Sequence, residues 1–184
     1  GTVANVNPIK GLETLIRASA RLRDMGHAPH VVIAGAISER QRGYHRRLEV
    51  LADELGLDRV RFIGARSDVR SVLQHLNVYI CSSVAESSPV SVWEAMAMSR
   101  PVVSTDVGDV PQYVINGENG FVVPVGDHLG MATSIASLLR DGDFRQRCGE
   151  RSRAIAVGNF DVYDVARATG DFYEQIVTIA DKTS

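Results

Sequence analysis

Two glutamates, Glu86 and Glu94, are the residues whose type and spacing point most directly to chemistry. A carboxylate that faces a crevice from a helix can accept hydrogen bonds from the vicinal hydroxyls of a ribose. The segment between the glutamates is rich in serine and leads into a predicted helix that begins near Pro89. Free backbone N–H groups and the helix dipole make such a helix start attractive to phosphate.

Lys10 lies near the start of another predicted helix, where it can add a full positive charge to a pyrophosphate site. A nucleotide that carries a sugar would use the lysine, the amides and the carboxylates together. The alternative interpretation is structural: Ser87 and Ser88 cap a helix, and Glu94 is a solvated surface residue. These residues by themselves leave both interpretations open.

Short β-branched runs alternate with longer amphipathic patterns, and they predict the elements that must hold these residues. Strands are expected near 2–4, 30–35, 59–64, 78–81, 101–104 and 121–124. Helices are expected near 8–25, 39–55, 68–76, 89–98 and 110–114, followed by a helical end from 127 with breaks near 141–143 and 158–159. Apolar strands that alternate with helices predict a buried parallel sheet with helices on both faces.

The expected fold class is therefore α/β, a doubly wound, Rossmann-like parallel sheet of about six strands with extra C-terminal helices. In such a sheet, ligands bind at the carboxyl ends of the strands. The loops that follow the predicted strands are small, polar and rich in glycine. They contain, in chain order, Asn5, Lys10, Gly64, Arg66 and Glu86. We predict the ligand site along this edge.

The composition argues against several classes of binding partner. The 184 residues include 20 Lys and Arg against 22 Asp and Glu, and this near-neutral balance argues against binding nucleic acid through bulk charge. No apolar run reaches the roughly 20 residues of a membrane span, so we expect no integral membrane segment, while peripheral association stays open. The cysteines, Cys81 and Cys148, do not make a disulfide framework, which favours a reducing, cytoplasmic compartment.

The segment from Glu86 reads Glu-Ser-Ser-Pro-Val-Ser-Val-Trp-Glu, and Ala-Met-Ala follows directly. Asn-Pro-Ile-Lys-Gly stands at 7–11, and Asn-Gly-Glu-Asn-Gly-Phe-Val-Val-Pro stands at 116–124. Together with 55–64 and 100–108, these segments resemble the glutamate-x7-glutamate pattern of retaining GT-B glycosyltransferases of the family 4, or "group 1", type. The resemblance covers nearly the whole chain.

The resemblance implies that residues 1–184 are the C-terminal, donor-binding domain of such an enzyme. Members bind a nucleotide-diphosphate sugar and transfer the sugar with retention at the anomeric carbon, with no cofactor and no required metal. It implies that Glu86 contacts the donor sugar, Glu94 holds the ribose and Lys10 binds the diphosphate, with Glu86 and Lys10 as the catalytic residues. The other implied substrate-binding residues are Asn5, Gly64, Arg66, Ser87, Ser88, Val90, Ser91 and Val92.

Three positions depart from the family's pattern. The family often has an arginine where this chain has Asn5, and glycines where it has Ser87 and Pro89. Pro89 has no N–H group and cannot donate to phosphate. The family also often has a glutamate where Gln112 stands. These departures bear on donor identity and efficiency.

Other motifs have structural interpretations. Asp141-Gly142-Asp143 matches a metal-binding pattern, but it follows a helical segment, so we expect a turn between helices. Trp93 and Cys81 are expected in the core. The arginines at 40, 42, 46 and 47 are expected on a solvated helix face. The chain has no Gly-x-Gly-x-x-Gly or P-loop pattern, which disfavours a dehydrogenase or an NTPase.

The predicted function is the donor-binding half of a glycosyltransferase of glycan or polysaccharide synthesis, whose N-terminal acceptor domain is absent from this chain. The alternatives are an isolated nucleotide-sugar binding module without turnover and a GT-B nucleotide-sugar epimerase. The last predicted helices carry an apolar stripe of Val162, Val165, Phe172, Ile176 and Ile179. We expect this stripe to pair with the missing domain or with another copy in a dimer.

Overall fold

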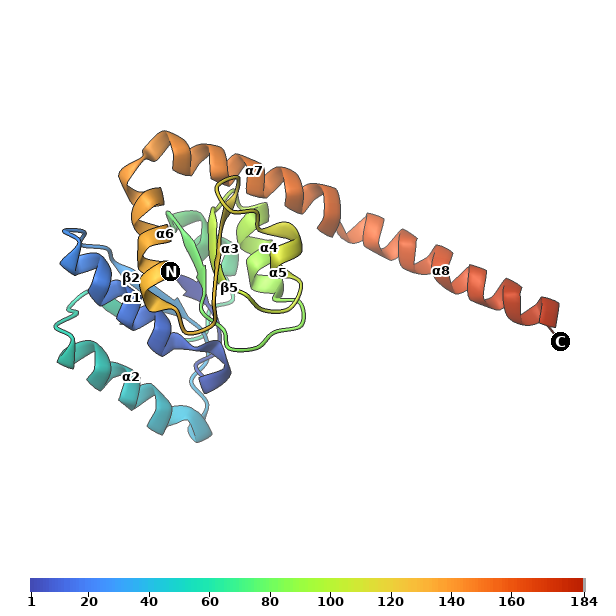
Figure 1. Ribbon diagram of the computed structural model, residues 1–184. Helices are drawn as coiled ribbons and strands as arrows, with labels where there is room; N and C mark the ends of the chain where they lie inside the picture. Colours follow the sequence, from blue (N-terminus) through green and yellow to red (C-terminus); the bar gives the residue numbers. More distant parts are fainter. Residues whose placement is uncertain (184) are drawn as a thin grey trace.

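The computed structural model describes the backbone of residues 1–183 and the side-chain surroundings of residues 1–177. Figure 1 shows short strands in the centre, helices on both sides of them, and one long helix that projects from the body. The strands are β1 (Thr2–Val3), β2 (Val31–Ala34), β3 (Val60–Phe62), β4 (Tyr79–Cys81), β5 (Val102–Thr105) and β6 (Gly120–Val123).

The strands form two parallel, three-stranded halves in the orders β1-β2-β3 and β4-β5-β6. The halves meet beside Gly1. Its amino group donates to the carbonyl oxygen of Val78 at 3.0 Å, and its carbonyl oxygen accepts from the N–H of Ile80 at 2.8 Å. Across the sheet the order is therefore β3-β2-β1-β4-β5-β6, and the predicted doubly wound α/β fold is confirmed.

The α-helices agree with the predicted pattern. They are α1 (Leu12–Asp24), α2 (Arg42–Glu54), α3 (Val69–His75), α4 (Val90–Ala97), α5 (Val110–Tyr113), α6 (His128–Arg140), α7 (Gly142–Phe160) and α8 (Val162–Thr183). Two short 3-10 turns, η1 (Pro8–Lys10) and η2 (Glu39–Gln41), precede α1 and α2.

One predicted break is wrong. The chain stays helical through Gly158 and Asn159, because a single glycine weakens a helix without ending it and the Asn159 side chain donates to the carbonyl of Ile155 at 2.8 Å. The break comes at Asp161, whose carboxylate accepts from the N–H of Tyr163 at 2.9 Å and so starts α8. Asp141 likewise accepts from Phe144 at the start of α7, as expected for a turn between helices.

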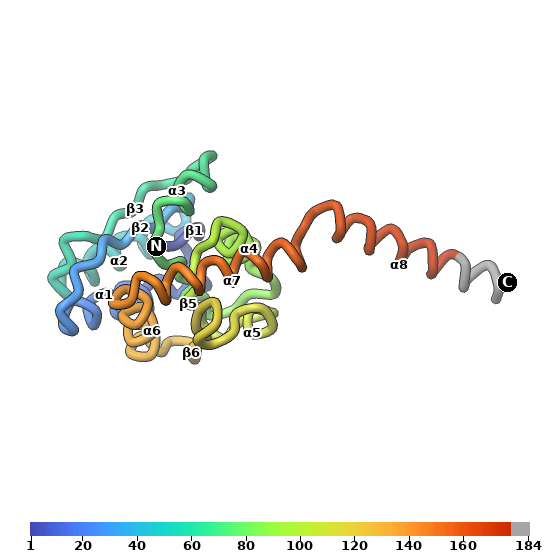
Figure 2. Tube along the Cα trace, turned by 90° about the horizontal axis from the view of Figure 1, so that it is seen from above, coloured from blue at the N-terminus to red at the C-terminus, as the bar shows by residue number. Residues whose placement is uncertain are grey.

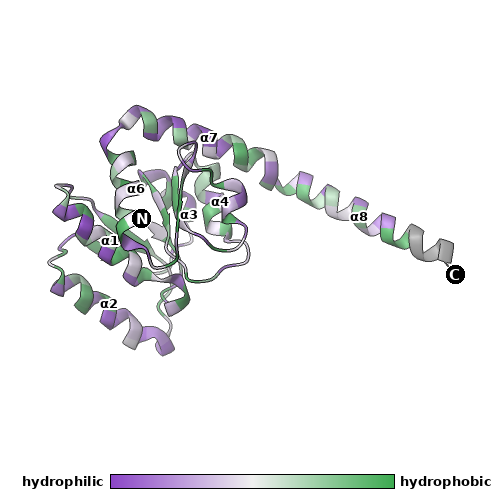
Figure 3. Ribbon diagram, viewed as in Figure 1, coloured by the Kyte–Doolittle hydropathy of each residue, from purple (hydrophilic) through white to green (hydrophobic). Residues whose placement is uncertain are grey.

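The core has two layers, one on each face of the sheet. Successive strand residues point to opposite faces, so Ile33 and Val103 pack under α1, α2 and α6, whereas Val32 and Val102 face α3, α4 and α7. Both faces are packed with apolar side chains, and the central strands in Figure 3 are largely coloured as hydrophobic. This double burial explains why the strands are continuous hydrophobic runs rather than alternating ones.

Helix α8 leaves the body, as Figure 2 shows. Its apolar side chains are largely exposed, with exposed fractions of 70% at Val162 and 59% at Phe172. Ile179, the last residue of the predicted stripe, lies outside the residues whose side chains the structure describes. Within the described chain, no helix combines the length and the apolar character needed to cross a bilayer.

Candidate functional site

Two loops meet where the strand order reverses, between β1 and β4. Lys10 lies in the loop after β1 and Glu86 in the loop after β4, and Nζ of Lys10 is 2.6 Å from Oε1 of Glu86. The carboxyl edge beside such a switch point is where doubly wound sheets bind ligands. The structure therefore brings the two predicted catalytic residues together at the predicted edge.

Backbone contacts fix the two loops against each other. The N–H of Val84 donates to the carbonyl of Ile9 at 2.7 Å, and the Ser82 hydroxyl donates to the carbonyl of Lys10 at 2.9 Å. Gly11 has φ +54°, and a Cβ there would lie 2.1 Å from the carbonyl oxygen of Ser82. Glycine adopts this backbone conformation without strain, and its lack of a Cβ allows this close approach, so Gly11 holds Lys10 beside the second loop.

Two residues that sequence reasoning missed hold Glu86. The Ser83 hydroxyl donates to Oε1 of Glu86 at 2.7 Å, and the Thr105 hydroxyl donates to the carbonyl of Ser83 at 2.6 Å. Ser83 and Thr105 are both buried. Thr105 is the last residue of β5, and Ser83 lies just beyond the end of β4. Because buried hydroxyls at a strand end need hydrogen-bond partners, these positions could have indicated from the sequence that both residues belong to the site.

A hollow of about 320 Å³ opens beside Lys10 at the same edge, and Asn5 and Arg66 also line it. Oδ1 of Asn5 accepts from the N–H of Ala36 at 3.0 Å. Arg66 forms two hydrogen bonds of 2.8 Å to Asp68, and this pairing lowers the pKa of the Asp68 carboxyl. The hollow thus combines the Lys10 ammonium with a guanidinium that Asp68 partly neutralises.

The predicted loop after β3 joins this edge through its backbone. The carbonyl of Gly64 accepts from the N–H of Gly35 at 2.8 Å, and the N–H of Val6 donates to the carbonyl of Ala36 at 2.9 Å. The loops after β1, β2 and β3 are therefore tied side by side. Of the predicted residues, Asn5, Lys10, Gly64 and Arg66 belong to this group.

Helix α4 supplies the predicted phosphate-binding amides, with one correction. The N–H of Val92 donates to the carbonyl of Pro89 at 2.8 Å, so the prediction that this amide is available to a ligand is wrong. The first turn of the helix already uses it. The amides of Val90 and Ser91 have no hydrogen-bond partner among the described residues.

The serines of this loop do not cap the helix. Pro89 is the N-cap residue, and no side chain caps α4. Oγ of Ser88 instead accepts from the indole N–H of Trp93 at 3.1 Å, and Oγ of Ser91 accepts from the Tyr79 hydroxyl at 2.8 Å. The alternative interpretation, in which Ser87 and Ser88 cap the helix, is therefore wrong. Trp93 is buried as expected, and its ring stacks on that of Phe160 with 4.5 Å between the ring centroids.

Glu94 lies on the exposed side of α4. Its carboxylate makes no hydrogen bond or ion pair within the part of the chain that the structure describes. The structure gives no contact between Glu94 and the Lys10–Glu86 pair. It leaves the carboxylate free to accept hydrogen bonds from a ligand or from water.

The loop after β5 closes on the segment Glu86–Ser87. A Cβ on Gly108 would lie 2.1 Å from the carbonyl oxygen of Ser87, and the N–H of Asp109 donates to that oxygen at 3.0 Å. The Oδ1 atom of Asp109 is buried and has no partner among the described residues. The edge thus presents the cations of Lys10 and Arg66, each paired with a carboxylate, together with free amides and further carboxylate oxygens, a set that can bind an anion with attached hydroxyl groups.

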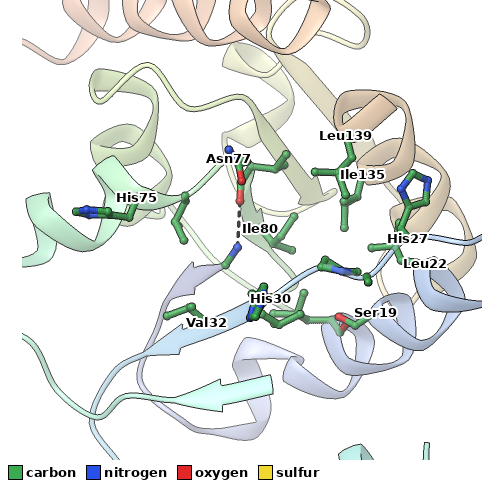
Figure 4. A pocket seen from close by; sticks show the side chains of 17 residues that line it. Ser19, Leu22, His27, His30, Val32, His75, Asn77, Ile80, Ile135 and Leu139 are labelled. Carbon is green, nitrogen blue, oxygen red and sulfur yellow. Dashed lines mark hydrogen bonds between the residues drawn. The ribbon is translucent and has the colours of Figure 1, made fainter. Parts of the chain in front are cut away.

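Figure 4 shows a second hollow, of about 420 Å³, at the opposite edge of the sheet. It lies near the amino ends of β2 and β4, and apolar side chains such as Leu22 and Ile135 line it together with His27, His30 and His75. None of the predicted site residues lines it. The carboxyl edge is therefore the site that the sequence pattern and the geometry share.

The sequence of this chain is similar to a known protein family and to several curated proteins. The family model described as "Glycosyl transferases group 1" matches residues 1–155. The lipopolysaccharide core biosynthesis glycosyltransferase LpsE of Rhizobium meliloti is 36% identical over 152 residues, which are 82% of this chain and 42% of that protein. The D-inositol 3-phosphate glycosyltransferase of Corynebacterium jeikeium is 32% identical over 181 residues, 96% of this chain and 43% of its own length.

Solved structures share the fold. Anabaena Alr3699/HepE, solved in complex with UDP and glucose, has a TM-score of 0.88 at 25% identity, and the match covers 95% of this chain and 47% of that one. The C-terminal domain of a group 1 family protein (LpcC) from Francisella tularensis has a TM-score of 0.80 at 22% identity, covering 88% and 85%. The expected fold, that of a C-terminal GT-B domain, is confirmed, and the chain belongs to the group 1 glycosyl transferases.

Proposed function

We propose that residues 1–184 form the donor-binding domain of a retaining glycosyltransferase. The domain would bind a nucleotide-diphosphate sugar, and the enzyme would transfer the sugar to an acceptor in glycan or polysaccharide synthesis. The observation that carries the proposal is the Lys10–Glu86 pair at the switch point of the sheet, in which Glu86 lies on the loop that leads into the free amides of α4. The Lys10 ammonium and the free amides supply hydrogen-bond donors for a diphosphate at the edge where doubly wound sheets bind ligands.

Apart from Val92, whose amide the first turn of α4 uses, each predicted residue has a role in this proposal. Lys10 and the amides of Val90 and Ser91 bind the diphosphate, with no metal ion required. They also stabilise the negative charge that develops on it as the bond to the sugar breaks. Glu86 contacts the donor sugar, and Glu94 accepts hydrogen bonds from the ribose hydroxyls. The other residues that support binding are Asn5 and Arg66, which line the hollow, Gly64 in the loop after β3, and Ser87 and Ser88 in the loop before α4.

The relatives support the proposal but are longer. The chain spans about two-fifths of the curated relatives cited above and about half of the HepE chain. We therefore assign the acceptor site to an N-terminal domain of the same protein, and the exposed apolar face of α8 to contact with that domain or with a second copy. Because HepE has been solved with UDP and glucose, UDP and UDP-glucose are the first ligands to test. The cytoplasmic location expected from the two free cysteines stays a prediction.

Calorimetry of the 184-residue chain with UDP and with GDP tests the binding site. We expect Lys10→Ala to weaken binding of the preferred nucleotide about 10- to 100-fold, because a charge-assisted hydrogen bond contributes about 1.5–3 kcal/mol. Glu94→Gln should weaken binding of the nucleotide and leave binding of inorganic pyrophosphate unchanged. Arg17→Ala, on an exposed position of α1, is the control. If neither UDP nor GDP binds, the proposed function is refuted.

Turnover requires the longer protein. With a labelled nucleotide sugar and an acceptor, the proposal expects transfer that Glu86→Gln and Lys10→Ala both reduce. The anomeric configuration of the first product, read by NMR, tests retention: an inverted product contradicts it. Conversion of the nucleotide sugar without an acceptor would instead indicate an epimerase, and binding without any conversion would indicate a binding module.

A further inference from the structure

We propose that the Lys10–Glu86 ion pair is one state of an exchange that couples the two halves of the donor. In this exchange, the diphosphate takes Lys10 away from Glu86. The released carboxylate, still held by Ser83, then accepts a hydrogen bond from a hydroxyl of the donor sugar. The inference deepens the proposed function and rests on it.

The pair itself is the first observation. Lys10 and Glu86 lie 2.6 Å apart with only 27% and 15% of their side chains exposed, so each charge largely cancels the other. An incoming diphosphate therefore meets a neutral pair and not a free cation. A carboxylate and a phosphate within reach of one ammonium in a half-buried site repel each other. The phosphate, which carries the larger charge, displaces the carboxylate.

The second observation is that Glu86 has an anchor besides Lys10. The Ser83 hydroxyl donates to the same Oε1 atom at 2.7 Å. Ser83 is buried with 3% exposed, and the buried Thr105 hydroxyl donates to its carbonyl oxygen at 2.6 Å. When Lys10 leaves, the carboxylate keeps its position at the switch point and gains a vacant acceptor site. Ser83 and Thr105 are therefore positioning residues, which act through Glu86.

The exchange has a consequence for the order of events. A nucleotide sugar compensates the broken ion pair with new hydrogen bonds from its sugar to Glu86. A nucleoside diphosphate, which is the product of transfer, also breaks the ion pair, but it has no sugar hydroxyl to donate a hydrogen bond to Glu86. The site should therefore bind the donor in preference to the product, and the return of Lys10 to Glu86 should help to release the product.

Calorimetry with two ligands, UDP and UDP-glucose, tests the exchange, with GDP and GDP-mannose used in their place if wild type prefers GDP. Glu86→Gln keeps the shape of the side chain and removes its charge. We expect UDP to bind this variant about fivefold more tightly than wild type, as expected when a half-buried ion pair worth about 1 kcal/mol no longer competes. UDP-glucose should gain nothing or bind more weakly.

A second variant isolates the anchor. Ser83→Ala should leave the affinity for UDP unchanged and weaken UDP-glucose about fivefold, because only the sugar uses the positioned carboxylate. A structural defect would weaken both ligands alike, so the ratio of the two affinities separates positioning from misfolding. Arg17→Ala, on an exposed position of α1, should change neither affinity.

The outcomes are distinct. If wild type binds neither nucleotide, the proposed function fails. If wild type binds UDP but Glu86→Gln binds it equally or more weakly, the exchange is refuted while the donor site stands. If Ser83→Ala weakens UDP and UDP-glucose by the same factor, the positioning role of Ser83 is refuted.

Discussion

Replacement of Gly11 by alanine tests whether the contact between the two site loops is as close as the structure has it. Gly11 has φ +54°, and an added Cβ would lie 2.1 Å from the carbonyl oxygen of Ser82. The left-handed backbone costs an alanine about 1–2 kcal/mol. The overlap with a backbone atom, which cannot rotate away, adds about 1–3 kcal/mol. We expect Gly11→Ala to lower the free energy of unfolding by about 2–5 kcal/mol.

Gly26 provides a matched control. It also has a positive φ, +85°, but an added Cβ would meet no atom within 4 Å. Gly26→Ala should therefore show the conformational cost alone, about 1–2 kcal/mol. Urea unfolding of wild type and both variants gives the two differences, provided that the slope against denaturant stays the same.

The same two variants also test the geometry of the candidate site. If Gly11 holds Lys10 beside Ser82, Gly11→Ala should also open the Lys10–Glu86 pair and change UDP affinity, whereas Gly26→Ala should not. Equal destabilisation of the two variants, within about 0.5 kcal/mol, would show that the loops have room to separate. In that case the close approach would not be what positions Lys10.

Two further predictions concern the rest of the molecule. Cys81 and Cys148 are buried, and burial raises the pKa of Cys148, so a thiol reagent should label them only as the protein unfolds; rapid labelling in native buffer would be inconsistent with this packing. Truncation after Asp161 should change the unfolding free energy by less than about 1 kcal/mol, because α8 side chains such as Val162 are largely exposed; a loss above about 2 kcal/mol would mean that α8 packs on the body.

Much of the fold could be predicted because it depends on local periodicity. Apolar strands that alternate with amphipathic helices indicated a buried parallel sheet, and the structure has strands and helices at the predicted places. The predicted break near Gly158 and Asn159 failed for a local reason. Capping by Asp161, two residues further on, outweighs the weak helix preference of one glycine.

The candidate site divides in the same way. The residue types of the loops, and the edge on which they lie, follow from the sequence, because each loop follows a predicted parallel strand. The hydrogen-bond partner that each polar group takes does not follow from the sequence. Val92 lies in the predicted amide cluster, yet its N–H is used within the first turn. Ser88, just before α4, accepts a hydrogen bond from the Trp93 side chain and does not cap the helix.

The sequence by itself determined the fold class, the edge that carries the polar loops and the resemblance to group 1 glycosyl transferases, because these depend on local patterns and motif spacing. Only the tertiary structure decided that Lys10 pairs with Glu86 and that Ser83 and Thr105 support the pair. Lys10 and Glu86 are 76 positions apart. They meet because β1 lies beside β4, an adjacency set by the packing of the whole sheet and not by any segment of the chain.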